Sequence, residues 1–170
     1  EFMNEISVGE MEAIFEAIAT LQIPERDTKS NPIFFVARSF DVNKPGTKIK
    51  DLSGGVLGGT LKQGTFKVGD EIEIKPGMSA KKHEQTIYTT LKTKILSLSS
   101  GNSRLDEAIP SGSLAIQTAL DPNLTKADNL SGCVVSLKGT LPEPIYDLKL
   151  KVHLFKEIVG EEKEVNVSPI

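Results

Sequence analysis

This sequence contains no tryptophan, a single cysteine and only two histidines. One cysteine cannot form an internal disulfide and is typical of a reducing compartment, so a cytoplasmic location is predicted. His83 and His153 lie far apart with no cysteine beside either, so no metal site is predicted. No apolar run approaches the roughly 20 residues of a membrane-spanning helix, and no membrane partner is expected.

Sequence motifs for nucleotide chemistry are also missing. There is no GxxxxGK[ST] phosphate loop, and the glycine pairs at 54–55 and 58–59 do not fit GxGxxG. Residues 51–54 match DxxG, and residues 43–46 resemble the start of NKxD with glycine in place of the acid. Without a phosphate loop we interpret both as chance matches. No paired acids or nucleophile constellation occurs, so no catalytic residue and no cofactor is predicted, and the chain is not expected to be an enzyme.

The 170 residues are 38 % hydrophobic and 25 % charged, as expected for a globular chain with one domain of ordinary size. The net charge of −3 argues against a general nucleic-acid binder. The charge is unevenly distributed, because residues 38–94 carry eleven basic and six acidic side chains while both flanking segments are acidic on balance. That basic block contains the glycine-rich segment and forms either a binding face or simply a solvated face.

Hydrophobic periodicity predicts one helix followed by strands. Residues 8–21 place apolar side chains at spacings of three and four, the pattern of an amphipathic helix. The later candidates are apolar or alternating, as strands are: residues 33–40, 54–61, 71–75, 86–99, 113–120 and 132–139. Turn signals separate them, among them KPGM at 75–78, and Gly64 and Gly69 are predicted to take positive φ. Short strands at this spacing predict an all-β closed barrel or a sandwich.

A proline-bounded break at residues 139–144 precedes one more strand candidate, residues 147–155. Its apolar side chains alternate with polar ones, as in a half-buried strand. A single strand cannot form a domain, so we expect that a further domain begins near residue 147.

Three long stretches resemble one protein family. RSFDVNKPGT (38–47), LSGGVLGGTLKQGTFKVGDEIEIKPG (52–77) and LDPNLTKADNLSG (120–132) are similar to the gamma subunits of archaeal and eukaryotic translation initiation factor 2, the archaeal ones in particular. The resemblance extends from Arg26 to Ile170. It implies a three-domain architecture like that of elongation factor Tu, with a GTP-binding domain followed by two β-barrels.

The resemblance also implies a domain organisation. Residues 3–23 would be the last helix of a missing GTP-binding domain and residues 24–32 a linker. Residues 33–140 would form a closed β-barrel of the elongation-factor-Tu second-domain type, and residues 147–170 the first strand and tail of a truncated third domain. GTP and magnesium belong to the full-length family, so neither is expected to bind this chain.

In the family, GTP-bound gamma holds the methionylated initiator tRNA, and the second barrel helps enclose the terminal adenosine and its methionyl ester. The implied pocket for the tRNA end lies at Gly112, Ser113, Leu114 and Ala115. The sequence departs from the family pattern at Ser111, Ser113 and Gln117, which bears on recognition of the methionyl group. Initiator tRNA is expected to bind this fragment weakly, and the ribosome only through the complete factor.

The resemblance further implies that this barrel docks the alpha subunit. A long charged loop on a rigid barrel is a common place for binding residues. We therefore expect the contact in two neighbouring loops, residues 44–51 and 78–85. The residues expected to form it are Lys44, Lys48, Lys50, Asp51, Lys81 and Lys82. The alternative is that both loops are simply solvated.

Two other functions are alternatives to this one. The first is the equivalent barrel of another translational GTPase, such as a selenocysteine-specific elongation factor. The RSFDVNKPGT stretch argues against it. The second is a free-standing enzyme on a β-barrel scaffold, which the lack of paired acids, metal ligands and a nucleophile disfavours.

Overall fold

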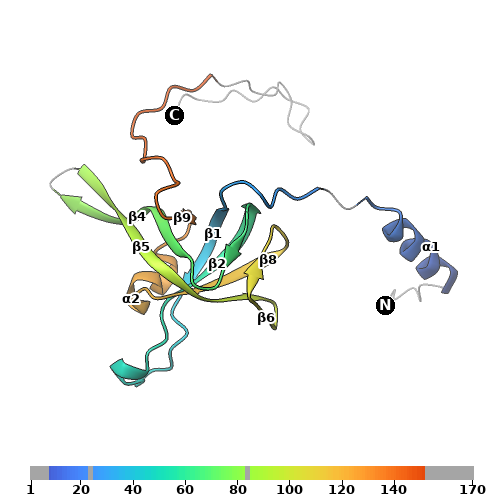
Figure 1. The fold of residues 1–170 in the computed structure, drawn as a ribbon, viewed down its shortest axis with the longest axis horizontal. Coiled ribbons are helices and arrows are strands. Elements are labelled where there is room, and N and C mark those ends of the chain that lie inside the picture. Colours follow the sequence, from blue (N-terminus) through green and yellow to red (C-terminus); the bar gives the residue numbers. More distant parts are fainter. Residues whose placement is uncertain (1–7, 23–24, 83–84, 152–170) are drawn as a thin grey trace, which may run out of the picture.

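The computed structural model describes residues 8–22, 25–82 and 85–151. Two short helices and two 3-10 turns accompany nine strands within these residues (Figure 1). In chain order the elements are α1 (Val8–Ala19), β1 (Ile33–Phe40), η1 (Ile49–Asp51), β2 (Val56–Gln63), β3 (Phe66–Lys67), β4 (Glu71–Lys82), β5 (Gln85–Ser100), β6 (Ser103–Leu105), β7 (Glu107–Ala108), β8 (Ser113–Thr118), α2 (Pro122–Thr125), η2 (Lys126–Asp128) and β9 (Val134–Leu137).

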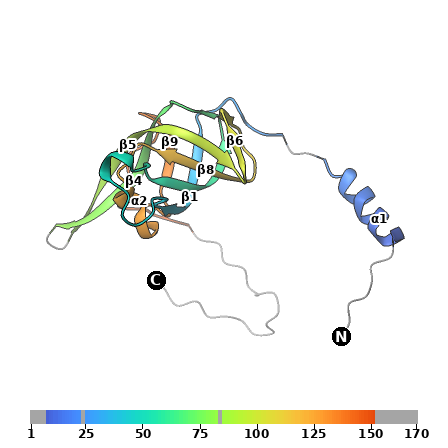
Figure 2. The ribbon, with the colours of Figure 1, turned by 90° about the horizontal axis from the view of Figure 1, so that it is seen from below.

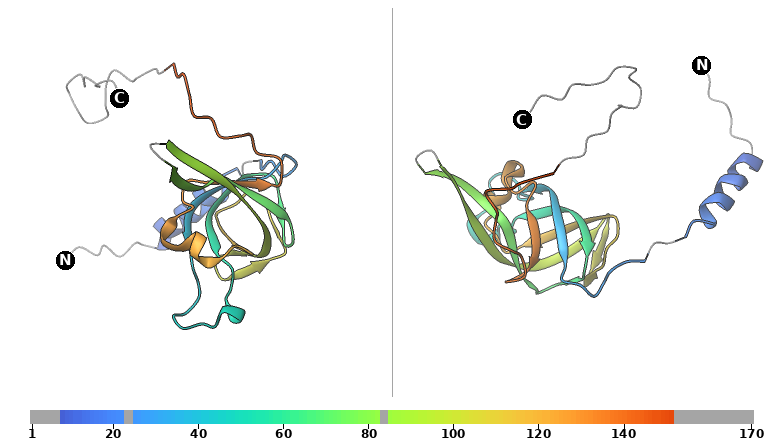
Figure 3. Two further views of the ribbon diagram at one scale, coloured as in Figure 1. Left: turned by 90° about the vertical axis from the view of Figure 1, so that its left-hand side faces the viewer. Right: turned by 90° about the horizontal axis from the view of Figure 1, so that it is seen from above.

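The strands form a closed antiparallel barrel, which confirms the predicted all-β fold and decides for a barrel over a sandwich. Strands pair in the order β4-β9-β1-β2-β8-β5, and pairing of β4 with β5 closes the ring. The left view of Figure 3 looks into the ring. Closure removes the unpaired edges that an open sheet of this size would expose. Within the described residues, no helix is both long enough and apolar enough to span a membrane.

The core lies inside the barrel, because alternate residues of each strand point inward. Phe34 of β1, Leu57 of β2 and Ile116 of β8 are completely buried, as are Ile72 and Ile74 of β4. Burial of each such side chain contributes roughly 1.5–3 kcal/mol. The strands predicted at 33–40, 71–75 and 86–99 lie within β1, β4 and β5, and the one predicted at 113–120 overlaps β8, which ends at Thr118. Their inward-facing apolar residues form much of the core.

Glycine is needed in the barrel wall for two different structural reasons. A Cβ on Gly59 would collide with the carbonyl oxygen of Phe35 on the neighbouring strand, so only glycine lets β1 and β2 approach there. Gly64 and Gly69 have φ of +74° and +98°, as predicted for turn residues.

Strand β4 departs from the expected pattern. Residues 75–78 form no turn; instead a bulge interrupts the pairing with β5 between Ile74 and Met78, and the strand then continues. Pro76 cannot donate a backbone hydrogen bond and Gly77 has φ of +84°, which suits a bulge as well as a turn. The predicted loop at 78–85 is therefore wrong, because its described residues extend β4 and β5 into a paired hairpin. Figures 1 and 2 show this hairpin projecting beyond the barrel.

The helix predicted at 8–21 is confirmed as α1, which ends at Ala19. It lies apart from the barrel (Figure 1). Every residue of its predicted apolar face is about half exposed or more. These residues are Met11, Ile14, Phe15, Ile18 and Leu21, the last of which lies beyond the end of the helix. Such a contiguous exposed apolar stripe is unusual on a folded chain that stands alone.

At the other end of the chain, residues 147–151 belong to no strand, and Leu148 and Leu150 are largely exposed. The predicted strand at 147–155 has no pairing partner for these five residues among the described strands. The rest of that segment, with His153, lies outside the described residues.

Candidate functional site

Three of the four residues predicted for the tRNA end line a single pocket of about 320 Å³, here called the β8 pocket. Ser113, Leu114 and Ala115 come from β8, while Gly112 lies just before the strand and outside the lining. The pocket is also lined by residues of β1, β2 and the β5–β6 turn region: Ala37, Arg38, Phe40, Gly58, Gly59, Thr60, Ser99 and Gly101. Pairing of Gly58 with both Arg38 and Ala115 brings the three strands together here.

The absence of a side chain at Gly58 helps to make this pocket. A Cβ there would lie 3.6 Å from Phe40 Cε1 and 3.8 Å from the Cβ of Arg38, which is ordinary van der Waals contact. The φ of Gly58 is not positive, so its backbone does not require glycine either. The close approach of neighbouring strands therefore requires glycine at position 59 but not at position 58. Glycine at position 58 keeps the pocket open, a distinction that the sequence motif does not reveal.

Arg38 is the one charged side chain among the residues that line the β8 pocket. Its Nε–H donates to both carboxylate oxygens of Asp128, at 2.9 and 3.0 Å. The backbone N–H of Ser39 donates to the same carboxylate at 3.0 Å. These hydrogen bonds, with that from Arg38 first, hold the pKa of Asp128 below its usual range. Asp128 therefore stays ionised, and Arg38 reaches the pocket as one half of an ion pair.

Gln117, one of the departures from the family pattern, lies in an adjoining hollow rather than in the β8 pocket. This second hollow, of about 360 Å³, shares Ser99 and Ala115 with the first. The Gln117 Oε1 accepts a hydrogen bond from Ser97 Oγ at 2.9 Å. Gln117 thus borders the β8 pocket without entering it.

The charged loop, residues 44–51, projects from the barrel between β1 and β2 (Figure 3). Its predicted contact residues Lys44, Lys48, Lys50 and Asp51 are all exposed. Ile49 is 89 % exposed, higher than any other large apolar side chain described. Ile49 thus projects into water between two exposed lysines, Lys48 and Lys50.

Asn43 closes the base of this loop. Its amide Nδ2 donates to the carbonyl of Ser53 at 2.8 Å, and its Oδ1 accepts from the Ser53 N–H at 2.7 Å. Asp41 in turn accepts from the backbone and the side chain of Asn43. The Asn43 amide thus makes the same pair of hydrogen bonds that a backbone segment of a neighbouring strand would make, and it fixes the base of the loop.

The second predicted contact lies on the hairpin rather than in a loop. Lys81 is exposed and pairs through its backbone with Thr86, and Lys82 pairs with Gln85. His83 lies outside the described residues. Figures 1 and 3 show the hairpin and the charged loop projecting in different directions, so the structure does not bring the two segments together.

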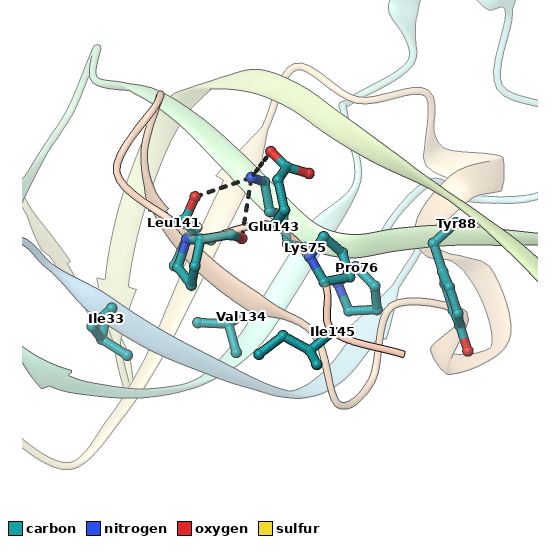
Figure 4. Close-up of a pocket in the computed structure, with 10 residues that line it drawn as sticks. Ile33, Lys75, Pro76, Tyr88, Val134, Leu141, Glu143 and Ile145 are labelled. Atoms are coloured by element: carbon teal, nitrogen blue, oxygen red, sulfur yellow. Dashed lines mark hydrogen bonds and ion pairs between the residues drawn. The ribbon is translucent and has the colours of Figure 1, made fainter. Parts of the chain in front are cut away.

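The largest of these pockets, about 560 Å³, contains none of the predicted site residues. It lies beside a segment that we call the strap, residues 139–145, which crosses the outer face of β4 (Figure 4). Lys75 Nζ donates to the carbonyls of Leu141 and Pro142 and to the Glu143 carboxylate, at 3.0, 3.2 and 2.8 Å. Lys75 alternates with the core residues Ile72 and Ile74 and so points away from the core, where the strap covers it.

Glu73 fastens the strap from the same strand. It is 3 % exposed, and its Oε1 accepts from the Leu141 N–H at 2.8 Å. Burial raises the pKa of Glu73, but hydrogen bonds from the backbone of the strap and the charge of Lys75 outweigh it, so the pKa lies below its ordinary value.

The fold is a closed antiparallel barrel of the kind that elongation-factor-Tu-like translational GTPases carry as their second domain. Comparison with curated proteins is specific. The chain is 48 % identical over 160 residues to translation initiation factor 2 subunit gamma of Methanocaldococcus jannaschii, covering 94 % of this chain and 38 % of that protein. The corresponding subunit of Pyrococcus furiosus is 49 % identical over 160 residues, with the same coverage of each chain. That of Thermoplasma volcanium is 43 % identical over 161 residues, covering 94 % and 39 %.

This chain belongs to the family of translation initiation factor 2 gamma subunits, and it spans 38 % to 39 % of the length of these curated relatives. No family model matches the chain.

Proposed function

We propose that this chain serves as the tRNA-end and alpha-subunit binding barrel of the initiation factor 2 gamma subunit. The observation that carries the proposal is the β8 pocket. Ser113, Leu114 and Ala115, selected by the family pattern, meet Arg38 and Gly58 from two other strands in one hollow. Most residues that line the pocket have small side chains, and Arg38 is the one charged residue among them. This combination suits the end of an RNA chain.

The domain boundaries follow from the same proposal. Residues 3–23 end a GTP-binding domain, residues 24–32 link it to the barrel of residues 33–140, and residues 147–170 begin a third domain. The exposed apolar face of α1 and the exposed Leu148 and Leu150 support this assignment, because surfaces of that kind are normally covered by a neighbouring domain. GTP and magnesium would then bind outside this chain, whose sequence contains no phosphate loop.

For the alpha subunit, we propose that the charged loop is the main contact and that Lys81 and Lys82 on the hairpin add basic charge. The loop is exposed, is held by Asn43 and presents Ile49 between Lys48 and Lys50. Complementary charge at the edge of such a contact chiefly sets orientation and association rate. Initiator tRNA is a weak partner of this chain alone, and the ribosome is reached through the complete cytoplasmic factor.

Binding of purified alpha subunit tests the proposal. We expect saturable binding of the 170-residue chain in surface plasmon resonance. An equivalent barrel from another translational GTPase should not bind under the same conditions. Absence of binding at micromolar alpha subunit would contradict the docking function, and equal binding by the other barrel would contradict its specificity.

A further inference from the structure

The segment that follows α2 contains unusual backbone. Ala127 and Asp128 have φ of +53° and +58°, in the left-handed backbone region that residues other than glycine rarely adopt. Such residues cost free energy and persist only where their surroundings hold them, which is often at ligand-binding positions.

The surroundings that hold this segment are contacts with β1, about ninety positions earlier in the chain. The Leu130 N–H donates to the Ser39 hydroxyl at 3.0 Å, and the Ser131 hydroxyl donates to the carbonyl of Ala37 at 2.9 Å. The result of this fixed backbone is the position of the Asp128 carboxylate, which accepts from Arg38. Both partners of this ion pair are substantially exposed, and exposed pairs contribute little to stability. The stability of this ion pair is therefore a poor explanation for the strained backbone, although the Asp128 carboxylate also accepts from the backbone N–H of Ser39.

Orientation of Arg38 is a better explanation for the strained backbone at Ala127 and Asp128. Asp128 occupies only the Nε–H of the guanidinium, and within the described residues neither terminal NH₂ group donates a hydrogen bond to the protein. Arg38 lines the β8 pocket, where Gly58 keeps the floor open and Phe40 supplies an aromatic edge. A guanidinium held by one edge, with its other donors free, is well suited to bind phosphate oxygens.

We propose that Arg38, positioned by Asp128, binds a phosphodiester group near the 3′ end of the RNA that the β8 pocket receives. The inference rests on the proposed function and adds the residue that binds, the residue that positions it and the chemical group that is bound. Asp128 acts through Arg38 and does not touch the RNA. Gly58 contributes to the same binding site, because a methyl group at position 58 would occupy the space beside both Arg38 and Phe40.

The test is a nuclear magnetic resonance titration of the isotope-labelled chain with a five-nucleotide single-stranded RNA ending in CCA. We expect saturable shifts at the Arg38 Nε–H and at the amides of Gly58 and Ala115. Arg38→Gln should weaken binding roughly tenfold, as expected for loss of a charge-assisted hydrogen bond. Asp128→Asn should weaken it roughly threefold, because asparagine tolerates the left-handed backbone but lacks the charge that holds Arg38.

Two further variants separate a binding role from a structural one. Gly58→Ala should weaken RNA binding about tenfold while the midpoint of thermal unfolding stays within a few degrees. Lys92→Gln removes an exposed cation outside the β8 pocket and should change the affinity less than twofold. In the free protein, Asp128→Asn should also accelerate solvent exchange of the Arg38 Nε–H, which checks that Asp128 holds the guanidinium before RNA binds.

The outcomes are distinguishable. If the unmodified chain shows no shifts in the β8 pocket at millimolar RNA, both the pocket's proposed function and this inference fall. If shifts occur but Arg38→Gln and Asp128→Asn bind as tightly as the unmodified chain, the pocket stands and the Arg38 inference is overturned. Equal weakening by Lys92→Gln and Arg38→Gln would reduce the binding to general electrostatic attraction and would also overturn it.

Discussion

The β8 pocket and the charged loop are two binding surfaces made in opposite ways. The pocket is part of the barrel wall, and its position follows from the pairing of β1, β2 and β8. The loop leaves the wall, and its shape depends on the side chain of Asn43 rather than on strand pairing. A change in the pocket wall therefore risks the whole fold, whereas a change in the loop should alter a partner's binding and little else.

The largest expected effect separates the two neighbouring glycines of the pocket. Gly59→Ala should destabilise the chain by more than about 3 kcal/mol, since its Cβ collides with the backbone of β1. Gly58→Ala should stay within about 1 kcal/mol of the unmodified chain, since its Cβ meets only ordinary contacts. Urea unfolding of both variants measures the difference. Equal losses would show that the wall needs both glycines and that Gly58 is not reserved for a ligand.

A second effect concerns the strap, which polar contacts with Glu73 and Lys75 attach to the barrel wall. Glu73→Gln should lower the free energy of unfolding at pH 7 by about 2 kcal/mol, because a buried carboxylate loses charge-assisted hydrogen bonds. The folded pKa of Glu73 lies below its ordinary value of 4.5, so this stabilisation is complete above pH 4.5. It is lost as the pH falls through the folded pKa.

The difference in unfolding free energy between the unmodified chain and Glu73→Gln should accordingly shrink below pH 4.5. Glu71→Gln is the matched control on the same strand, because Glu71 forms an exposed ion pair with Lys138. That variant should show no measurable loss. A difference for Glu73→Gln that does not vary between pH 7 and pH 3 would contradict a charged, hydrogen-bonded Glu73.

The next effect is on the loop alone. Asn43→Ala removes the side chain that closes the loop, so residues 44–51 should sample more conformations before binding. We expect roughly tenfold weaker binding of the alpha subunit and faster hydrogen exchange within the loop. Exchange in the barrel strands should be unchanged. Loss of protection throughout the barrel would show that Asn43 supports the fold and would remove the contrast between loop and wall.

The smallest expected effect on stability comes from the loop surface. Reversing two charges with Lys48→Glu and Lys50→Glu should change stability by less than about 0.5 kcal/mol. Association with the alpha subunit should slow more than dissociation accelerates, and the difference should shrink at high salt. Lys92→Glu with Lys94→Glu, an equally spaced exposed pair on β5, serves as the control in surface plasmon resonance. Similar slowing by both pairs would move the contact away from the loop.

Much of the barrel could be predicted because its strands carry local signals. The run of residues 33–40 needs only its own apolar and β-branched side chains to favour an extended backbone, and it is β1 to the residue. The family pattern likewise selected Ser113, Leu114 and Ala115, which are consecutive on one strand. The hairpin was missed because Pro76 and Gly77 are the usual residues of a turn. Whether they end a strand or form a bulge depends on the strand beside them.

What the sequence by itself determined is therefore local: the helix of α1, the alternation of β1, β4, β5 and β8, and the positive φ of Gly64 and Gly69. What only the tertiary structure decided involves residues far apart in the chain. Arg38 meets Asp128 across ninety positions, and the strap covers Glu73 and Lys75, which alternation alone would place in water. Gly58 and Gly59 are adjacent and chemically identical, yet one faces the backbone of a neighbouring strand and the other an open pocket. The physical reason is that periodicity reports which way a side chain points, whereas burial and pairing depend on which other segment closes the barrel over it.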